Sequence, residues 1–98
     1  MKRVAYHRLA AAELIESARF YDRQRTGLGD EFLSAVEAAL EGVRARPLMG
    51  RRGLLGTLSF RTGRFPFRIV YAVQPDRTWI VAVAHLSRSP GYWASRLR

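Results

Sequence analysis

Three arginines around a single glycine are the side chains of this sequence best suited to bind an anion. Arg61, Arg64 and Arg68 surround Gly63, a residue typical of a tight turn between strands. A guanidinium can donate two parallel hydrogen bonds to a phosphate or a carboxylate. The spacing therefore predicts a cationic patch for a nucleic acid or an acidic protein segment, with a solvated edge as the alternative. Arg61 and Arg68 share a sheet face only if the strand register allows it.

Further candidates lie on either side of these arginines. Arg51 and Arg52 stand in a loop bounded by glycines, although this loop lacks the Lys-Ser/Thr pair of a phosphate-binding P-loop. Tyr92 and Trp93 could stack against bases, but such a pair more often packs a chain end onto a sheet. The ordinary pKa of His85 suits acid–base catalysis near neutral pH. We interpret His85 as a structural residue that hydrogen-bonds neighbouring backbone, with catalysis as the alternative.

The composition excludes several classes of chemistry. With no cysteine and two histidines, the chain can form no disulfide, thiolate metal site, thiol nucleophile or three-histidine metal site. Asp76 is the one acidic residue after Glu41, and it falls in an expected turn, which argues against a Ser-His-Asp triad. The earlier acidic residues mostly lie opposite apolar stripes and are interpreted as solvated. We therefore expect neither a metal nor a cofactor.

The distribution of apolar residues also bears on location. No segment approaches the roughly 18 consecutive apolar residues that a membrane span needs. The basic N-terminus is not followed by the apolar segment of a secretory signal. We therefore expect a cytoplasmic protein that does not associate with a membrane.

Positive charge is concentrated in the second part of the chain. The chain has 98 residues, which indicates one domain over residues 1–98, and its net charge is +9. Residues 1–41 hold six basic and seven acidic side chains, whereas residues 42–98 hold eleven arginines and one acid. A surface of that sign attracts nucleic acid or acidic protein, so the imbalance predicts an anionic partner.

The first half of the sequence predicts a strand and two helices. Residues 2–6 form a short strand, and residues 8–25 carry an apolar stripe at helical spacing: Ala11, Leu14, Ile15, Ala18 and Tyr21. Gly27 is expected in the left-handed conformation that ends a helix. A second helix then opens at Asp30 and ends before Pro47. The short connection predicts an antiparallel helical hairpin.

The second half predicts a loop and three strands. Residues 47–56 form the loop, and strands follow at 57–62, 65–74 and 78–86. The last strand is apolar on both faces, with Trp79, Val81 and Val83 on one of them, so it should be a covered central strand. The fold class is therefore α+β with the order β-α-α-β-β-β, a helical hairpin packed on a small antiparallel sheet.

This order and several local motifs resemble the ParE/RelE superfamily of type II toxin–antitoxin toxins, also called plasmid-stabilisation proteins. The resemblance covers nearly the whole chain, and its most specific stretches look more like the ParE branch than the RelE branch. The motifs that carry it are Phe65-Pro66-Phe67-Arg68-Ile69-Val70-Tyr71, Val81-Ala82-Val83-Ala84-His85, and Arg88-Ser89-Pro90-Gly91-Tyr92-Trp93 with Arg96.

The resemblance implies a small bacterial protein that arrests growth and is neutralised by an antitoxin encoded beside it. The antitoxin's flexible tail would cover the helical hairpin and the sheet edge, and contact with operator DNA would occur only through the antitoxin. ParE-like members poison DNA gyrase, which makes gyrase the expected target. RelE-like members cut mRNA on the ribosome, which makes a metal-independent endoribonuclease the alternative. An inactive antitoxin-binding module is a third interpretation.

The RelE alternative can be compared residue by residue with the sequence. Arg61 and Arg68 match basic positions on the middle strands of those nucleases, and Tyr92 falls near their C-terminal tyrosine. Some nucleases of that branch use a histidine at the position of His85. Arg88 lies close to the place of a catalytic arginine after the last strand.

Two positions depart from the nuclease pattern. Ser59 replaces a second basic residue, and Leu86 stands where the arginine after the last strand is expected. These departures leave the charge of a cleavage transition state poorly stabilised. The leading interpretation is therefore a toxin that is not itself an enzyme. The residues expected to bind its target or its antitoxin are Arg51, Arg52, Arg61, Arg64, Arg68, Arg88, Tyr92, Trp93 and Arg96.

Overall fold

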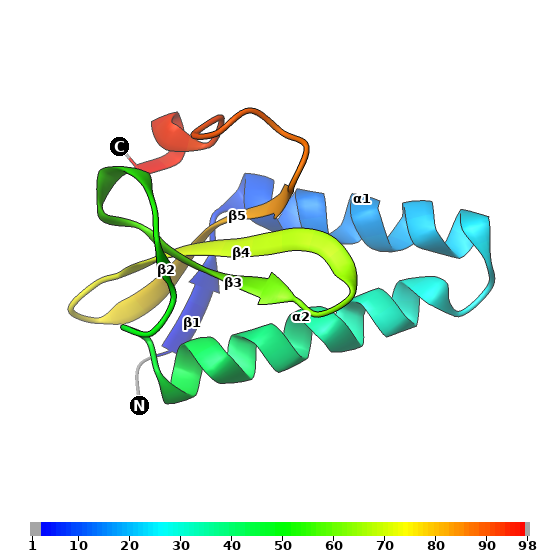
Figure 1. Cartoon of the computed structure of the whole chain (residues 1–98), viewed down its shortest axis with the longest axis horizontal. Helices are drawn as coiled ribbons and strands as arrows, with labels where there is room; N and C mark the ends of the chain where they lie inside the picture. The colour runs from blue at the N-terminus through cyan, green and yellow to red at the C-terminus, as the bar shows by residue number, and fades with distance from the viewer. Residues whose placement is uncertain (1–2, 98) are drawn as a thin grey trace.

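The helices and strands follow the predicted order, with one additional short strand. The computed structural model describes residues 3–97 of the chain. The elements are β1 (Arg3–Tyr6), α1 (Arg8–Gln24), α2 (Leu28–Ala45), β2 (Arg51–Arg52), β3 (Leu58–Thr62), β4 (Phe65–Val73) and β5 (Arg77–His85), with short 3-10 turns at Leu54–Gly56 and Ala94–Leu97. The α+β class and the helical hairpin are confirmed (Figure 1).

The sheet is mixed rather than wholly antiparallel, which corrects the predicted sheet. Its strand order is β1-β5-β4-β3-β2. β3, β4 and β5 form the expected antiparallel meander, but β1 pairs with β5 in the parallel direction. A parallel pair needs a long crossover connection, which the two helices supply. The predicted loop over residues 47–56 also contains β2, whose two residues are too few for a recognisable strand pattern.

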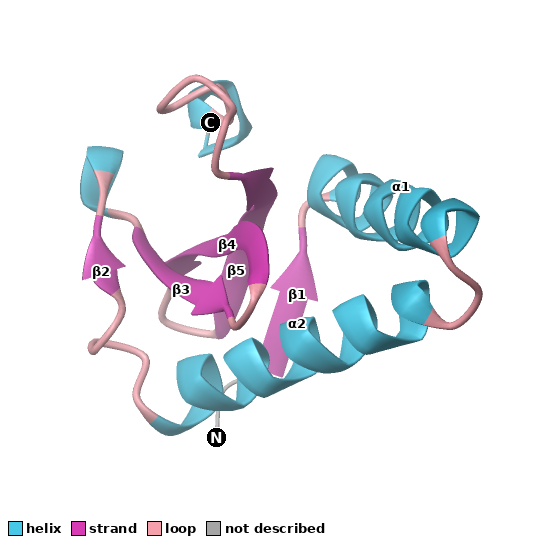
Figure 2. Ribbon diagram, turned by 45° about the vertical axis from the view of Figure 1, so that its right-hand side comes forward, coloured by secondary structure: helices cyan, strands magenta, loops and turns pink. Residues whose placement is uncertain are grey.

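Each face of the sheet is covered by a different part of the chain. The helices lie on one face, which we call the helix face, and the C-terminal segment crosses the other (Figure 2). Phe32, Val36 and Ile69 belong to the larger core under the helices. Val70 and Trp93 belong to a smaller core on the opposite face. β5 contributes to both cores, so its prediction as a covered central strand is confirmed.

An irregularity in β5 changes which of its residues share a face. Tyr71 lies opposite Ile80 and Val70 lies opposite Ala82, so Val81 is an additional residue on β5, a β-bulge. Strict alternation predicted Val81 and Val83 on one face. Instead Ile80 and Val83 join the core under the helices, and Val81 packs with Ala82 on the other side.

The apolar stripe of α1 is partly different from the prediction. Leu14, Ala18 and Tyr21 pack against the core, and Ala10 is fully buried one turn earlier. Ile15, which the pattern assigned to the core, is 51% exposed. Successive helical residues are 100° apart, so Ile15 lies to one side of the buried line through Leu14.

The turn between the helices requires two glycines for different reasons. Gly27 has φ 90°, which confirms the left-handed conformation expected there. Gly29 donates its N–H to Asp22 Oδ1 at 2.7 Å. A Cβ at Gly29 would lie 2.5 Å from the carbonyl oxygen of Ala18, so this glycine lets α2 begin in close contact with α1.

Replacing Gly29 by alanine should therefore destabilise the hairpin. We expect Gly29→Ala to lower the free energy of unfolding by about 1–3 kcal/mol, because the new methyl group meets rigid backbone. Urea denaturation followed by circular dichroism measures this change. Gly42→Ala in the same helix is the control, since its Cβ would lie 3.3 Å from the movable ring of Phe60. Equal stability of the two variants would contradict the packing argument.

Candidate anion-binding site

The strand register brings three arginines to the sheet face opposite the helices. Arg61 on β3 lies directly opposite Arg68 on β4, so the two side chains share a face as the sequence left open. Arg51 on β2 lies opposite Ser59 on β3. Ser59 is two residues before Arg61, so both side chains point to the same face, and Arg51 points to that face as well. We call Arg51, Arg61 and Arg68 the arginine cluster.

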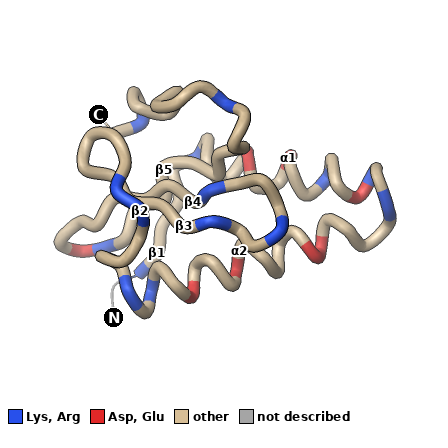
Figure 3. The backbone as a smooth tube through the Cα atoms, viewed as in Figure 1, with Lys and Arg blue, Asp and Glu red and all other residues tan. Residues whose placement is uncertain are grey.

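The side chains of the arginine cluster influence one another electrostatically. Arg68 donates from Nη1 to Ser59 Oγ at 3.1 Å. Partial burial, followed by the positive charges of Arg51 and Arg61, lowers the pKa of the Arg68 guanidinium below its usual value. Along the backbone, the basic positions of β2, β3 and β4 lie close together, whereas most acidic positions lie on the helices (Figure 3).

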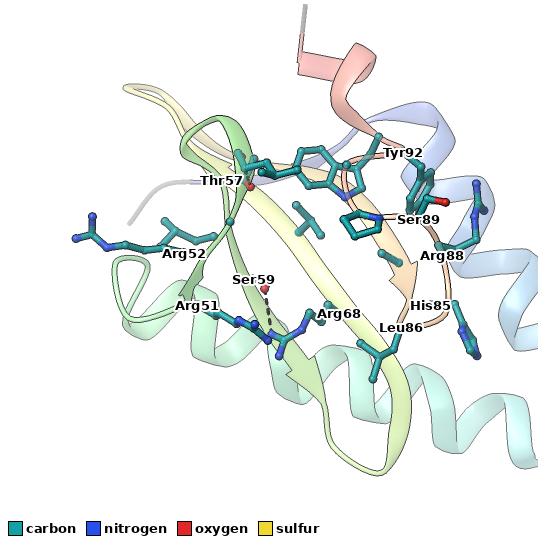
Figure 4. A pocket seen from close by; sticks show the side chains of 18 residues that line it. Arg51, Arg52, Thr57, Ser59, Arg68, His85, Leu86, Arg88, Ser89 and Tyr92 are labelled. Atoms are coloured by element: carbon teal, nitrogen blue, oxygen red, sulfur yellow. Dashed lines mark hydrogen bonds between the residues drawn. The ribbon is translucent and has the colours of Figure 1, made fainter.

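A half-open pocket of about 430 Å³ lies beside the arginine cluster. Its floor includes Ser59, Arg68 and Val70, and its walls are the segment after β2 and the segment after β5. Figure 4 shows the guanidinium groups of Arg51 and Arg68 together at one end, while Arg52 points away from them. None of the described residues that line the pocket is acidic. The pocket is thus large enough for a nucleotide-sized group and positive at one end.

The C-terminal wall of the pocket is held by aromatic residues. Trp93 is 6% exposed and packs with Val70 in the smaller core. The Arg88 guanidinium lies 3.9 Å from the centre of the Tyr92 ring, a cation–π contact. Of the two sequence interpretations of Tyr92 and Trp93, the structure therefore favours packing of the chain end for Trp93.

Glu13 on α1 connects this C-terminal wall to β5. Its Oε1 accepts hydrogen bonds from the Val83 N–H at 3.0 Å and from Arg96 Nη1 at 2.9 Å. Its Oε2 accepts from the Tyr92 hydroxyl at 2.8 Å and from Arg96 Nη2 at 2.9 Å. Arg96 Nη1 also donates to the Val81 carbonyl at 3.1 Å. Glu13, Tyr92 and Arg96 therefore form one network, which we call the Glu13 network.

The Glu13 network satisfies backbone groups that β5 would otherwise leave without partners. β1 pairs with β5 only as far as Ile80, where the chain turns into α1. Beyond that point the bulge leaves the Val81 carbonyl and the Val83 N–H directed at the edge. Buried backbone groups without partners are costly, so this charged pair replaces the missing strand.

Burial and hydrogen bonding act in opposite directions on Glu13. Burial alone would raise the pKa of the carboxyl, but bonds from Arg96, Tyr92 and the Val83 N–H hold it below its ordinary value. Burial and the Glu13 carboxylate together raise the pKa of the Tyr92 hydroxyl. Tyr92 therefore keeps its proton and donates a hydrogen bond to Glu13.

The remaining sequence candidates lie apart from the arginine cluster. Arg64 pairs with Glu31 on α2, and Arg96 belongs to the Glu13 network. His85 Nδ1 accepts the Ser87 N–H at 3.0 Å, which agrees with the structural interpretation of this histidine. Its ring points away from Arg68 (Figure 4). Among residues 3–97, no three side chains of the metal-binding types gather into a metal site.

Glu13 is the residue that sequence reasoning missed, because the helical acids were interpreted as solvated. Its side chain is 17% exposed and that of Arg96 is 11% exposed. The sequence did contain a sign that Glu13 is partly buried. Glu13 follows Ala10 by three residues and directly precedes Leu14, so it lies beside the buried line of α1. A carboxylate in that position needs a cationic partner, and Arg96 supplies it.

Removal of the Glu13 carboxylate should strongly destabilise the protein. Glu13→Ala leaves Arg96 buried without its partner, and breaking such a pair typically costs about 3–5 kcal/mol. Chemical denaturation measures the loss, and Glu16→Ala, an exposed acid on the same helix, is the control. If Glu13→Ala does not fold, Glu13→Gln is measured in its place, with a smaller loss expected. A change no larger than that of Glu16→Ala would contradict the role of the network.

The Glu13 network should also make stability depend on pH in a defined direction. The folded-state pKa of Glu13 is depressed, so its contribution is complete above the unfolded-state value of about 4.3. That contribution is lost as the pH falls through the folded-state pKa. The difference in unfolding free energy between wild type and Glu13→Gln should therefore be constant from about pH 6 to 8 and shrink below about pH 4. A difference that grew on acidification would contradict this assignment.

Neither helix among residues 3–97 is long and apolar enough to cross a membrane.

Comparisons with known proteins identify the family. The model of the ParE toxin of the type II toxin–antitoxin system parDE matches residues 4–90, which include Glu13 and the arginine cluster. A solved structure of the chromosomal ParDE toxin–antitoxin system from P. aeruginosa has a TM-score of 0.66 and 19% identity, and the match covers 89% of this chain and 98% of that one. No curated protein sequence matches. The family match spans most of the chain, and the chain therefore belongs to the ParE toxins of type II toxin–antitoxin systems.

Proposed function

We propose that this chain is a toxin that inhibits DNA gyrase in the cytoplasm and that a cognate antitoxin neutralises it. The observation that carries the proposal is the hydrogen bond from the Tyr92 hydroxyl to Glu13. In the RelE-type nuclease alternative, Tyr92 would stand near the tyrosine of the RNA-cleaving site, but here its hydroxyl donates to Glu13. A toxin that acts by binding its target needs no such acid, so the geometry favours a gyrase poison over a nuclease.

Two further residues also argue against the nuclease alternative. His85 accepts a hydrogen bond from the Ser87 N–H at Nδ1, so one of its two ring nitrogens is already engaged. Leu86 lines the pocket at the place where the nuclease pattern expects an arginine. His85 and Tyr92 line the same pocket as Arg68, but both are engaged in hydrogen bonds, to Ser87 and to Glu13. The proposed role of Arg61 and Arg68 is therefore to bind an anion, with no cleavage step.

The surface also suits an antitoxin with acidic and apolar residues. The arginine cluster would bind acidic side chains. On α1, Ile15 and Phe20 are 51% and 49% exposed, and they offer apolar contacts next to the hairpin. A flexible chain that covered both regions would bury the surface that contacts the target. Neutralisation by simple coverage follows from this arrangement.

The decisive assay combines the purified, antitoxin-free chain with DNA gyrase, ATP and relaxed plasmid. We expect loss of supercoiling and accumulation of protein-linked cleaved DNA on a gel. A parallel reaction with translating ribosomes and mRNA tests the nuclease alternative, for which Arg68→Ala is the diagnostic variant. Unaffected gyrase together with mRNA cleavage that Arg68→Ala abolishes would overturn the proposal. A folded chain that inhibits neither process and arrests no growth would indicate an inactive antitoxin-binding module.

A further inference from the structure

The arginine cluster concentrates positive charge that its surroundings do not neutralise. Among residues 3–97, the ion pairs involve Arg25, Arg44, Arg64 and Arg96, none of which belongs to the cluster. Like charges held on neighbouring strands repel one another. An anionic ligand at this face would relieve that repulsion.

The distances among the three arginine side chains of the cluster suit several phosphates of one chain better than a single anion. Arg51, Arg61 and Arg68 come from three successive strands, β2, β3 and β4. Neighbouring strands are about 4.8 Å apart and Arg51 is offset by two residues along the strand, so the three side chains originate within roughly 12 Å of one another. Long, flexible arginine side chains can therefore reach adjacent phosphates of one strand of nucleic acid.

The shape of the pocket favours a single strand over a duplex. The pocket holds about 430 Å³ between two walls of the protein, and its lining includes apolar residues such as Leu54, Val70 and Pro90 as well as Arg51 and Arg68. A duplex keeps its bases stacked inside and presents a convex backbone, which cannot enter such a space. A single strand can place phosphates on the arginines and turn one base onto the apolar part of the lining.

We propose that the arginine cluster and this pocket bind the phosphate backbone of single-stranded DNA. The choice of DNA over RNA rests on the proposed function, because the cleaved DNA expected on stalled gyrase has broken strands whose ends are no longer held in an intact duplex. The toxin would then contact the nucleic acid directly as well as the enzyme. Arg51, Arg61 and Arg68 are the phosphate-binding residues, and Leu54, Val70 and Pro90 are the apolar lining that the base would contact.

The test measures binding of the purified chain, without gyrase, to a fluorescent oligo-dT by anisotropy over a series of salt concentrations. Replacing one arginine of the cluster by glutamine should weaken binding about tenfold, because a charge-assisted hydrogen bond is lost. The slope of log K against log salt is negative, and the triple variant Arg51→Gln, Arg61→Gln, Arg68→Gln should reduce its magnitude by about 2. Arg23→Gln, an exposed position on α1, removes one equal charge outside the pocket and should change affinity much less.

Several other results of this binding assay would overturn the proposal. Equal affinity and salt slope in wild type and the triple variant would overturn it. Tighter binding of a duplex with the same number of phosphates would overturn the single-strand assignment, and tighter binding of oligo-U would overturn DNA as the ligand. Much tighter binding of polyglutamate than of oligo-dT at equal charge concentration would assign the cluster to an acidic protein segment alone and overturn the DNA site.

The same assay separates this inference from the proposed function. Binding of oligo-dT that depends on the cluster, combined with unaffected gyrase, would keep the DNA site and reject gyrase as the target. If wild type inhibits gyrase and the triple variant still binds oligo-dT as tightly as wild type, gyrase remains the target and the DNA site is rejected.

Discussion

The unpaired edge of β5 is the constraint on which the rest of the structure depends. β1 ends opposite Ile80, and the bulge at Val81 turns backbone groups outward where no strand follows. Glu13 and Arg96 fill that edge with charged hydrogen bonds. Because Glu13 belongs to α1 and Arg96 to the C-terminal segment, one ion pair fixes three separate parts of the chain. The same bonds position Tyr92 and hence the wall of the pocket.

The two faces of the sheet differ in how much they contribute to the core. The helix face holds most of the buried apolar side chains, and its loss would unfold the protein. The opposite face has a smaller core at the C-terminal side and the arginine cluster at the β2 side. The repulsion among these arginines opposes folding, which supports the proposal that the cluster serves binding. A small domain can accept this cost because the Glu13 network and the larger core lie elsewhere.

Local patterns in the sequence predicted the elements well, but not their long-range partners. The turn at Gly27 and the two-faced strand β5 followed from residue types, and the spacing of Arg61 and Arg68 was compatible with their actual pairing. The parallel β1–β5 pair and the bulge at Val81 depend on contacts across the chain that periodicity does not encode. Glu13 was missed for this reason, since its partner lies 83 residues away.

The central claim is that this ParE toxin acts through its arginine cluster while the Glu13 network maintains the fold. Growth of a bacterial host that expresses the triple variant Arg51→Gln, Arg61→Gln, Arg68→Gln tests it most directly. Wild type and the Arg23→Gln control should arrest growth, whereas the triple variant should not, although its circular dichroism spectrum and melting temperature match those of the wild type. Growth arrest by the folded triple variant at the wild-type level would contradict the account.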